Sequence, residues 1–572
     1  MKKTIFLLAA FLFHNFIFSQ YNQWVWMKGN NTVNQPPVFG TKGVANAANK
    51  PGSLYEPAEW TDLQGNFWHF GGSDNTGFRS DLWKYDPLTN MWTWMKGSGL
   101  SNQSGIYGTI GIPAAANNPG GRIVPASWTD NSGNFWMFGG SGRDATGAAG
   151  SMNDLWKYDP VINQWTWMKG SNLINQAGVY GVKGIPSVAN TPGARYETSC
   201  TWVDNAGNLW LFGGDGMNSG IRFNDLWKYD ITTNQWTWMS GSNLTNQPGV
   251  YGTQGIPNST NIPSARSVYT SWKDNNGDLW LFAGDQGGGG QPLNDLWRYT
   301  ISTNEWTWVS GSNLPNQLGI YGTKCVPSTA NSPGARSENR TRWTDDCGNF
   351  WTFGGFLTFN DLWRYNPVTN IWTWVSGANF KNQLGNYGVQ GVATVTNIPG
   401  SRGGAVGWKD KNNNFWLFGG FENTLNNRLN DLWKYTPDKP TASFTFTPNN
   451  ACGPANVSFS NSSVPNCNQI RYSNWNFGDP GSGINNTSSL TNPTHVFNNP
   501  GTYPVKLVVT SCTGSKDSIT QTVTVISCGC SISAQTGLIN GTTCNGGTNG
   551  SASVNISNGS GGIYTYNWSN GI

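Results

Sequence analysis

The amino-acid sequence predicts an all-β protein built from one repeated unit, and three observations lead to this prediction. The motif Asp-Leu-Trp-Lys/Arg-Tyr recurs six times, beginning at Asp81, Asp154, Asp225, Asp295, Asp361 and Asp431. Its spacing is nearly constant, at 73, 71, 70, 66 and 70 residues. The chain holds 32 Trp and 74 Gly in 572 residues, and no stretch beyond its N-terminus shows a sustained helical period. A fixed period of this kind indicates a repeat architecture.

Each repeat contains four strand-like pieces, which in the third repeat span residues 196–204, 208–214, 225–230 and 235–239. The second piece is apolar without alternation, which is typical of a strand covered on both faces. It ends in Gly-Gly in five repeats and in Ala-Gly in the fourth, where backbones must crowd or turn. A small sheet with apolar residues on both faces needs neighbours on both sides, and radial repetition supplies them in a β-propeller.

The strand ending in Phe-Gly-Gly, the following Asn-Asp-Leu-Trp-x-Tyr-Asp and the final Asn-x-Trp-Thr recur through the repeats. In these motifs residues 21–438 resemble the kelch family of galactose-oxidase-like propellers. The resemblance implies one four-stranded blade per repeat around a central channel.

The ends of the repeat array predict six blades. The sixth repeat stops at Tyr435 without its Trp-Thr-Trp strand, and a matching strand stands near the N-terminus, at residues 23–29. We therefore expect the N-terminal strand to close the last blade; seven blades are the alternative.

Two further modules follow the repeats. Residues 442–527 resemble a PKD domain, an immunoglobulin-like β-sandwich, through the segments 475–479, 492–497 and 500–507. Residues 530–572 resemble the start of an SprB-type adhesin repeat, a partial β module, through 544–554 and 561–571. Because this resemblance stops within a module, we expect the chain to be a fragment of a longer protein.

The N-terminus predicts export. Residues 1–20 have the order of a signal peptide, with Lys2 and Lys3 before an apolar run that ends at Phe18. A membrane anchor is the alternative, but His14 and Asn15 interrupt the run, and a spanning helix needs about 20 apolar residues. No later segment is expected to cross a membrane.

Cysteine usage agrees with an oxidising compartment. Cys325 and Cys347 are the only cysteines of their repeat, which predicts a local disulfide between them. Cys200 is expected to be a buried thiol. The remaining six lie in the C-terminal part, and their connectivity is left open: Cys452, Cys467, Cys512, Cys528, Cys530 and Cys544.

Composition and charge restrict the partners. The net charge is +4, or about +2 without Lys2 and Lys3, and the basic residues are spread along the chain. Nucleic acid is therefore not an expected partner. We expect a monomeric propeller whose partner is a surface carbohydrate or a protein.

Catalytic chemistry is not expected. Some kelch propellers resemble copper radical oxidases, which implies two histidine ligands and a Tyr cross-linked to Cys. Beyond residue 20 only His69 and His495 remain, in different domains, and His69 lies inside an apolar strand as a core residue would. The Asp-x-x-Gly-Asn segments are interpreted as hairpin turns rather than calcium loops. No carboxylate pair departs from the repeat as a glycosidase would need. We predict no cofactor, no metal and no catalytic residue.

Two sets of side chains are candidates for ligand binding. One is a recurrent arginine in the long connection before each blade except the first, where Leu54 replaces it: Arg122, Arg195, Arg266, Arg336 and Arg402. These arginines either anchor the connection or form a ring of cations at the channel mouth. The other set lies in the variable loops between the second and third strands: Arg79, Arg143, Arg222, Arg428, Phe78, Phe223 and Phe421. Variable loops on one face of a constant scaffold are typical of a binding surface.

Together these features predict an exported, cell-surface or secreted protein without enzymatic activity. The propeller would be the binding or adhesion head, and the PKD and SprB-like modules would form its stalk. Two alternatives remain open at this point. One is a carbohydrate-active enzyme or sugar isomerase, which predicts acidic residues converging at the propeller mouth; the other is a structural spacer without a ligand.

Overall fold

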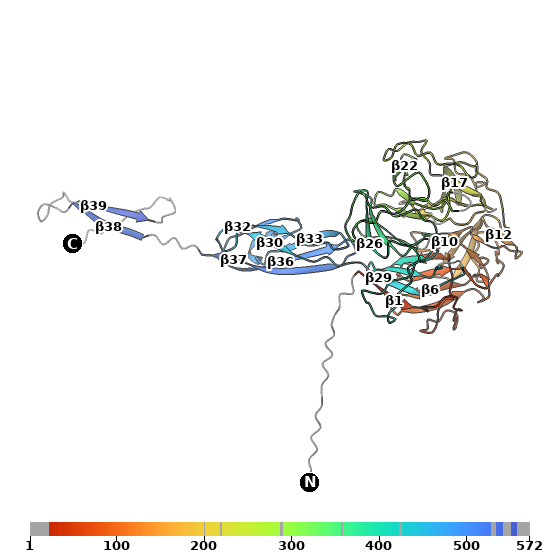
Figure 1. Ribbon diagram of the computed structural model, residues 1–572, viewed down its shortest axis with the longest axis horizontal. Helices are drawn as coiled ribbons and strands as arrows, with labels where there is room; N and C mark the ends of the chain where they lie inside the picture. The colour runs from red at the N-terminus through yellow and green to blue at the C-terminus, as the bar shows by residue number, and fades with distance from the viewer. Residues whose placement is uncertain are drawn as a thin grey trace, which may run out of the picture. The chain divides into compact units, whose positions relative to one another are not determined.

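The computed structural model describes residues 22–198, 201–217, 220–286, 290–355, 359–422, 426–527, 533–540 and 551–557. Within these residues the protein is built of β-strands with one 3-10 helix, η1 (Pro480–Asn486) (Figure 1). Two compact units divide the chain. The first comprises residues 1–440 together with the loops 465–471 and 510–515, and the second comprises 441–464, 472–509 and 516–572.

The first unit holds six antiparallel four-stranded sheets, which are the six predicted blades. Blade 1 is formed by β2 (Ala58–Thr61), β3 (Phe67–Phe70), β6 (Leu82–Asp86) and β7 (Met91–Lys96). Blade 2 is formed by β9 (Ala126–Thr129), β10 (Phe135–Phe138), β13 (Leu155–Asp159) and β14 (Gln164–Lys169). Blade 3 is formed by β15 (Thr201–Val203), β16 (Leu209–Asp215), β17 (Arg222–Asp230) and β18 (Gln235–Ser240).

The other three blades repeat this order. Blade 4 is formed by β19 (Thr270–Lys273), β20 (Leu279–Phe282), β21 (Leu296–Thr300) and β22 (Glu305–Ser310). Blade 5 is formed by β23 (Arg342–Thr344), β24 (Phe350–Phe353), β25 (Leu362–Asn366) and β26 (Ile371–Ser376). Blade 6 is formed by β27 (Val406–Lys409), β28 (Phe415–Phe418), β29 (Leu432–Thr436) and β1 (Gln23–Lys28).

The last blade is closed by the N-terminal strand, as predicted. β1 pairs antiparallel with β29, and Trp24 lies opposite Tyr435 while Trp26 lies opposite Trp433. Trp24 is buried and its ring lies 5.2 Å from that of Phe353, in blade 5. The ring is therefore closed inside blade 6, by the non-covalent pairing of β1 with β29.

Aromatic packing joins each blade to the next. The Trp60 ring of β2 stacks on Phe135 of blade 2, with centroids 5.2 Å apart, and its indole N–H donates to the carbonyl of Trp136 at 3.1 Å. The same indole-to-carbonyl bond recurs from Trp128 to Trp210 and from Trp202 to Trp272. Burial of large rings on both faces of a thin sheet explains the unbroken apolar pattern of the second strands.

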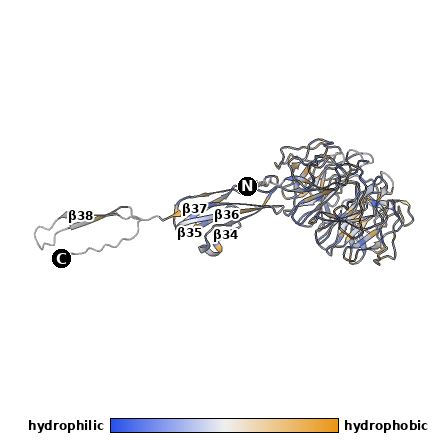
Figure 2. Ribbon diagram, turned by 90° about the horizontal axis from the view of Figure 1, so that it is seen from below, coloured by the Kyte–Doolittle hydropathy of each residue, from blue (hydrophilic) through white to orange (hydrophobic). Residues whose placement is uncertain are grey.

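Glycine is required where the second strand ends. Gly139 has φ 68°, and a Cβ atom there would lie 2.6 Å from the carbonyl oxygen of Arg195 in the next blade. The backbones of neighbouring blades therefore come close together at the Gly-Gly pairs, as predicted. Hydrophobic and hydrophilic residues are interspersed across this unit (Figure 2).

Short strands extend the loops between the second and third strands of two blades. β8 (Arg122–Ile123), β11 (Ser141–Arg143) and β12 (Ala149–Ser151) form a small sheet beside blade 2. β4 (Ser73–Asp74) and β5 (Gly77–Phe78) form a hairpin in blade 1.

The second unit contains an immunoglobulin-like sandwich. One sheet has the order β30 (Phe444–Thr447), β32 (Ala455–Asn461) and β35 (Thr494–Phe497). The other has the order β31 (Ala451–Cys452), β37 (Lys516–Ile526), β36 (Gly501–Ser511), β33 (Ile470–Asn476) and β34 (Thr487–Ser488). Val505, Leu507 and Val509 alternate along β36 and are fully buried, which is typical of a strand with one face against the core. A hairpin of β38 (Ser533–Asn540) and β39 (Ser551–Ser557) follows.

Candidate functional site

The recurrent arginines are buried ion pairs, and the prediction that they form a cationic ring at the mouth is wrong. In blade 3 the Arg195 guanidinium donates from Nη1 to Asp225 Oδ1 at 2.7 Å and from Nη2 to Asp225 Oδ2 at 2.8 Å. Both side chains are completely buried. The same pairing recurs in four other blades: Arg122–Asp154, Arg266–Asp295, Arg336–Asp361 and Arg402–Asp431. The structural interpretation, in which the arginine anchors the long connection, is therefore confirmed.

The aspartate of each Asp-Leu-Trp motif is the centre of a hydrogen-bond network. Besides Arg195, Asp225 accepts from the Tyr180 hydroxyl at 2.7 Å and from the Trp227 indole N–H at 2.7 Å. Burial alone would lower the pKa of Arg195, but the carboxylate of Asp225 outweighs burial and the pKa is raised. Tyr-Gly and Arg recur in the long connection because both side chains bind this carboxylate.

Blade 1 achieves the same pairing with exchanged residues. Leu54 occupies the position of the recurrent arginine, and Arg79 occupies a position held by Phe223 in blade 3. Arg79 donates from Nε to Asp81 Oδ2 at 3.0 Å, so the buried carboxylate keeps a guanidinium partner. In blade 3 the Phe223 ring covers Arg195 at 4.2 Å from its centroid. Arg79 was predicted to bind a ligand; it instead replaces the missing anchor.

Three of the remaining ligand-binding candidates in the variable loops are buried or half-buried. Phe421 is 0% exposed and packs against Tyr55, so its predicted role in ligand contact is wrong. Arg222 is buried between Asp215, at 2.9 Å, and Asp285, at 3.3 Å. Phe223 is half-buried beneath Arg195.

Arg428 and Phe78 line an open pocket. It has a volume of about 580 Å³ and lies between residues 73–78, residue 34 and residues 426–428. Arg428 donates from Nη1 to Asn75 Oδ1 at 2.7 Å and lies 5.0 Å from the centroid of the Tyr55 ring. Arg143, in the equivalent loop of blade 2, is half-buried and donates to the carbonyl of Gly147.

Three glutamates from alternate blades converge at the centre of the ring. Glu56, Glu197 and Glu338 each stand shortly before the first strand of blades 1, 3 and 5, with φ 56°, 57° and 52°. In blades 2, 4 and 6 this position is held by Val124, Val268 and Gly404, also at positive φ. Four backbone hydrogen bonds join neighbouring positions of this set: the N–H of Glu56 donates to the carbonyl of Gly404, that of Val124 to Glu56, that of Val268 to Glu197 and that of Gly404 to Glu338.

The carboxyl groups of this glutamate cluster are close together and poorly compensated. One oxygen from each lies within 4.8 Å of the others. Glu56 is 1% exposed, whereas Glu197 and Glu338 are half-buried. Burial, followed by the charges of the other two carboxyls, raises the pKa of Glu56 well above its usual range, and the pKa of Glu197 is raised by burial and by Glu338.

The cluster lies at the end of the channel that carries the variable loops. Tyr55 and Tyr196, directly before Glu56 and Glu197, form bridges with Ser73 and Asp215, the first residues of those loops. Burial and then the charge of Glu56 raise the pKa of Tyr55 to about 12. The predicted binding face and the glutamate cluster therefore belong to one mouth.

The expectation that no carboxylates depart from the repeat is wrong, although the sequence contained a signal. The chain has only six glutamates, and three of them occupy the same repeat position, 141 residues apart in each step (56, 197 and 338). The signal is visible only once the position is known to face the axis.

His69 is a core residue, as predicted. It is 0% exposed in β3, where its ring stacks on Phe418 and meets Trp92 edge to face. Neither ring nitrogen has a hydrogen-bond partner among the described residues, and burial lowers the pKa of His69 to about 3. His495 belongs to the other unit, where it bonds Asp479 at 3.0 Å.

The Asp-x-x-Gly-Asn segments are hairpin turns, as predicted. In blade 3 Asp204 Oδ1 accepts the backbone N–H groups of Ala206 and Asn208, and Oδ2 accepts the Trp210 indole N–H. The carboxylate is therefore used within its own turn and offers few free lone pairs to a cation.

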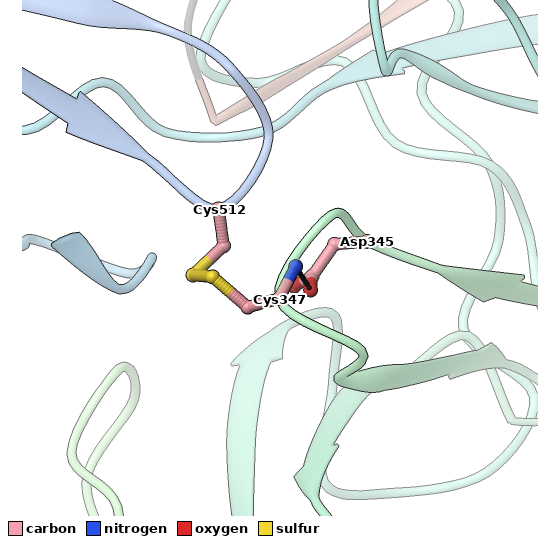
Figure 3. A group of neighbouring side chains, drawn as sticks. All are labelled: Asp345, Cys347 and Cys512. Atoms are coloured by element: carbon pink, nitrogen blue, oxygen red, sulfur yellow. Dashed lines mark hydrogen bonds between the residues drawn. A yellow bond between two sulfur atoms is a disulfide. The ribbon is translucent and has the colours of Figure 1, made fainter. Parts of the chain in front are cut away.

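The predicted disulfide between Cys325 and Cys347 is wrong. Cys325 pairs with Cys467 and Cys347 pairs with Cys512, each across more than 140 residues. Cys467 and Cys512 lie in the loops 465–471 and 510–515, which belong to the first unit. Figure 3 shows Asp345 beside the second disulfide; its carboxylate accepts the Cys347 N–H, so this group is a turn next to an oxidised cysteine pair and not a metal centre.

Some sequence predictions fall outside the described residues. These are the signal peptide at residues 1–20, the buried thiol at Cys200, and most of the SprB-like segment with Cys528, Cys530 and Cys544. Within the described part of the chain, no helix is long and apolar enough to cross a membrane.

Comparison with known proteins identifies one module. A PKD domain model matches residues 437–526. Among curated proteins, the dynein alpha chain of the flagellar outer arm of Chlamydomonas reinhardtii is 26% identical over 175 residues, which are 30% of this chain and 3% of that protein. This chain therefore spans only a small fraction of that relative.

Among solved structures, YjhT is similar at 13% identity and a TM-score of 0.40, covering 69% of this chain and 95% of that one. A fungal alcohol oxidase of the AA5 family, in complex with copper, is similar at 12% identity and a TM-score of 0.40, covering 85% and 100%. Both are too distant to transfer an activity to this chain.

Proposed function

We propose that this chain is an exported binding protein whose propeller holds its ligand at the mouth that contains the glutamate cluster. The proposal rests on the position of the residues that differ from the repeat. Glu56, Glu197 and Glu338 depart from the aliphatic residues and glycine of the other blades, and the variable loops surround them. In a repeat protein, residues that differ from the repeat are expected where a partner binds, and here they lie together at one mouth of the channel.

The chemistry of the mouth favours a neutral or cationic ligand. Its centre holds three carboxyls, whereas the recurrent arginines are buried in ion pairs. Half-buried Tyr55 and Tyr196 supply aromatic surface, and Phe78 and Arg428 line the adjoining pocket. Aromatic rings beside polar groups bind saccharides and peptides equally well, so the ligand is a surface carbohydrate or protein of low negative charge.

The PKD domain and the disulfides support an extracellular setting. PKD-like sandwiches are modules of extracellular proteins, and disulfides persist in oxidising compartments. We infer a stalk role for the PKD domain and the segment after it, and a monomeric propeller as the head.

A glycan array and a pull-down from cell envelopes, both with the whole chain, test this proposal. We expect saturable binding that Phe78→Ala with Arg428→Ala reduces at least tenfold while the melting temperature changes little. Leu88, which is 89% exposed, lies in the turn between the third and fourth strands of blade 1; Leu88→Ser is the matched control and should bind normally. Equal binding by both variants would contradict the proposed mouth, and the absence of any ligand would favour a spacer.

A second candidate function is supported by the same cluster. Burial and then the charges of Glu197 and Glu338 raise the pKa of Glu56, which favours a proton on this carboxyl beside Glu338, and Glu338 is partly exposed to solvent. Such a pair suits proton transfer to a small substrate, as in a sugar isomerase or another carbohydrate-active enzyme. Proton NMR of reducing sugars with the wild-type chain and Glu338→Gln tests it; identical spectra over time with both proteins would exclude it.

A further inference from the structure

We propose that the glutamate cluster binds one calcium ion on the axis of the propeller, independently of any ligand at the mouth. The charges of the glutamate cluster are poorly compensated by nearby cations. The other carboxylates near the cluster already have cationic partners: Glu59 is paired with Arg340 at 3.2 Å, and Asp215 and Asp285 are paired with Arg222. Among the described residues, Glu56, Glu197 and Glu338 have no side chain of opposite charge within ion-pair distance, although Arg340 lies near enough to favour their ionised forms. A divalent cation supplies the missing positive charge.

Some buried oxygens of the cluster are left without hydrogen-bond partners in the described part of the chain. Glu56 is 1% exposed, yet its Oε1 atom has no hydrogen-bond partner, and Glu197 Oε2 and Glu338 Oε2 are buried without partners as well. The hydroxyl of Thr198, next to Glu197, is also buried and unpartnered. Buried polar atoms are almost always satisfied, so unpaired carboxylate oxygens on three side chains that converge at one point indicate a bound species that supplies positive charge.

The spacing of the carboxylates indicates the type of ion. Calcium binds oxygen at 2.3–2.6 Å, so two ligand oxygens on opposite sides of one ion are at most about 5 Å apart. The three carboxylate oxygens lie within 4.8 Å of one another, which places them around a single ion of that size. Carboxylates are hard ligands that select calcium or magnesium over softer metals. Magnesium demands shorter, strictly octahedral contacts and usually retains several waters, whereas a site built of several protein carboxylates is typical of calcium.

An ion at this position would link blades of the propeller. The three ligands come from blades 1, 3 and 5, so one ion would bind alternate blades together at the axis. This contact adds to the closure by β1, which is also non-covalent. Calcium bound to the folded ring and not to the unfolded chain stabilises the ring by mass action.

Isothermal titration calorimetry and thermal unfolding of the whole chain test the proposal, after dialysis against EDTA and then into metal-free buffer. We expect one calcium ion per chain with a dissociation constant in the micromolar to millimolar range, tenfold weaker binding of magnesium, and a melting temperature that rises by several degrees with CaCl2. EDTA should reverse the rise.

Two variants distinguish this cluster from other acidic groups. Glu197→Gln should bind calcium at least tenfold more weakly and lose the rise in melting temperature. Glu305→Gln, on the outer strand β22, is the matched control and should behave like the wild-type chain. Should Glu197→Gln fail to fold, Glu338→Gln replaces it. The proposal would be overturned if no calcium binding were detected up to 10 mM CaCl2, a concentration about tenfold above the weakest dissociation constants of natural calcium modules. Equal calcium binding by all variants would also overturn it, as would magnesium binding as tight as that of calcium.

Discussion

The buried arginine–aspartate pair of each blade makes a sharp prediction, because blade 1 shows how its loss can be compensated. Arg195→Leu copies the Leu54 position of blade 1 and removes two guanidinium bonds, of 2.7 and 2.8 Å, from the fully buried Asp225. Asp225 keeps its bonds from Tyr180 and Trp227, but its charge stays buried without a cation. Removing one partner of such a pair costs about 3–5 kcal/mol, so we expect a loss of this size.

A second substitution should restore most of this stability. Phe223→Arg on the Arg195→Leu background places a guanidinium where Arg79 stands in blade 1, and Arg79 reaches Asp81 at 3.0 Å. We expect at least half of the lost free energy, about 2 kcal/mol, to return. Phe223→Arg alone should destabilise the protein, since it adds a second cation beside Arg195 and removes the ring that covers it.

Guanidinium unfolding followed by tryptophan fluorescence measures these changes, because buried Trp residues occur in every blade. The midpoints of the wild-type, single and double variants should fall in the order wild type, double, Arg195→Leu. If the single variant lost less than about 1 kcal/mol, or the double variant were no more stable than the single, the carboxylate would not depend on a guanidinium partner and the reasoning would be refuted.

Three further predictions address the core, the closure and the disulfides. His69→Leu, which introduces the residue of blades 3, 4 and 6, should raise the free energy of unfolding by about 1–3 kcal/mol at pH 7, because two buried unpaired nitrogens are removed. Because the pKa of His69 is lowered to about 3, the wild type should lose up to about 1.4 kcal/mol per pH unit as pH falls below 6.5, and a variant with the same acid slope would contradict this. Trp24→Ala should lower stability by about 3–5 kcal/mol by weakening the closing strand, as thermal unfolding can show; an unchanged midpoint would mean that β1 does not hold the ring. Cys347→Ser with Cys512→Ser should cost about 2–5 kcal/mol, and non-reducing peptide mapping should show the 347–512 link in the wild type and not a 325–347 link.

Several features of the fold could be predicted from the sequence because they repeat. The Asp-Leu-Trp motif, the apolar second strand and the Trp-Thr-Trp strand specify the blade through neighbouring residues. The missing strand after Tyr435 and the matching strand at Trp24 predicted how the ring closes, and β1 pairs with β29 accordingly. The Asp204 turn and the burial of His69 also follow from short-range patterns.

The candidate site could not be predicted from the repeat, because it depends on contacts between residues far apart in the sequence. Arg195 is buried because it pairs with Asp225, which lies 30 residues further along the chain. The sequence pattern of a recurrent arginine is the same whether the side chain is exposed or buried in an ion pair. The disulfides join residues 142 and 165 positions apart, so proximity in sequence gave the wrong pair.

The blade, the number of blades and the closing strand could be predicted from the order of the amino acids, because local patterns specify each blade and the missing last strand of the sixth repeat specifies the closure. Which residues face the axis depends on the closed ring. Glu56, Glu197 and Glu338 are separated by two whole repeats each, and their carboxyls meet because the ring curves alternate blades toward a common centre. Local patterns specify strands and their burial, whereas the convergence of distant side chains depends on the geometry of the closed ring.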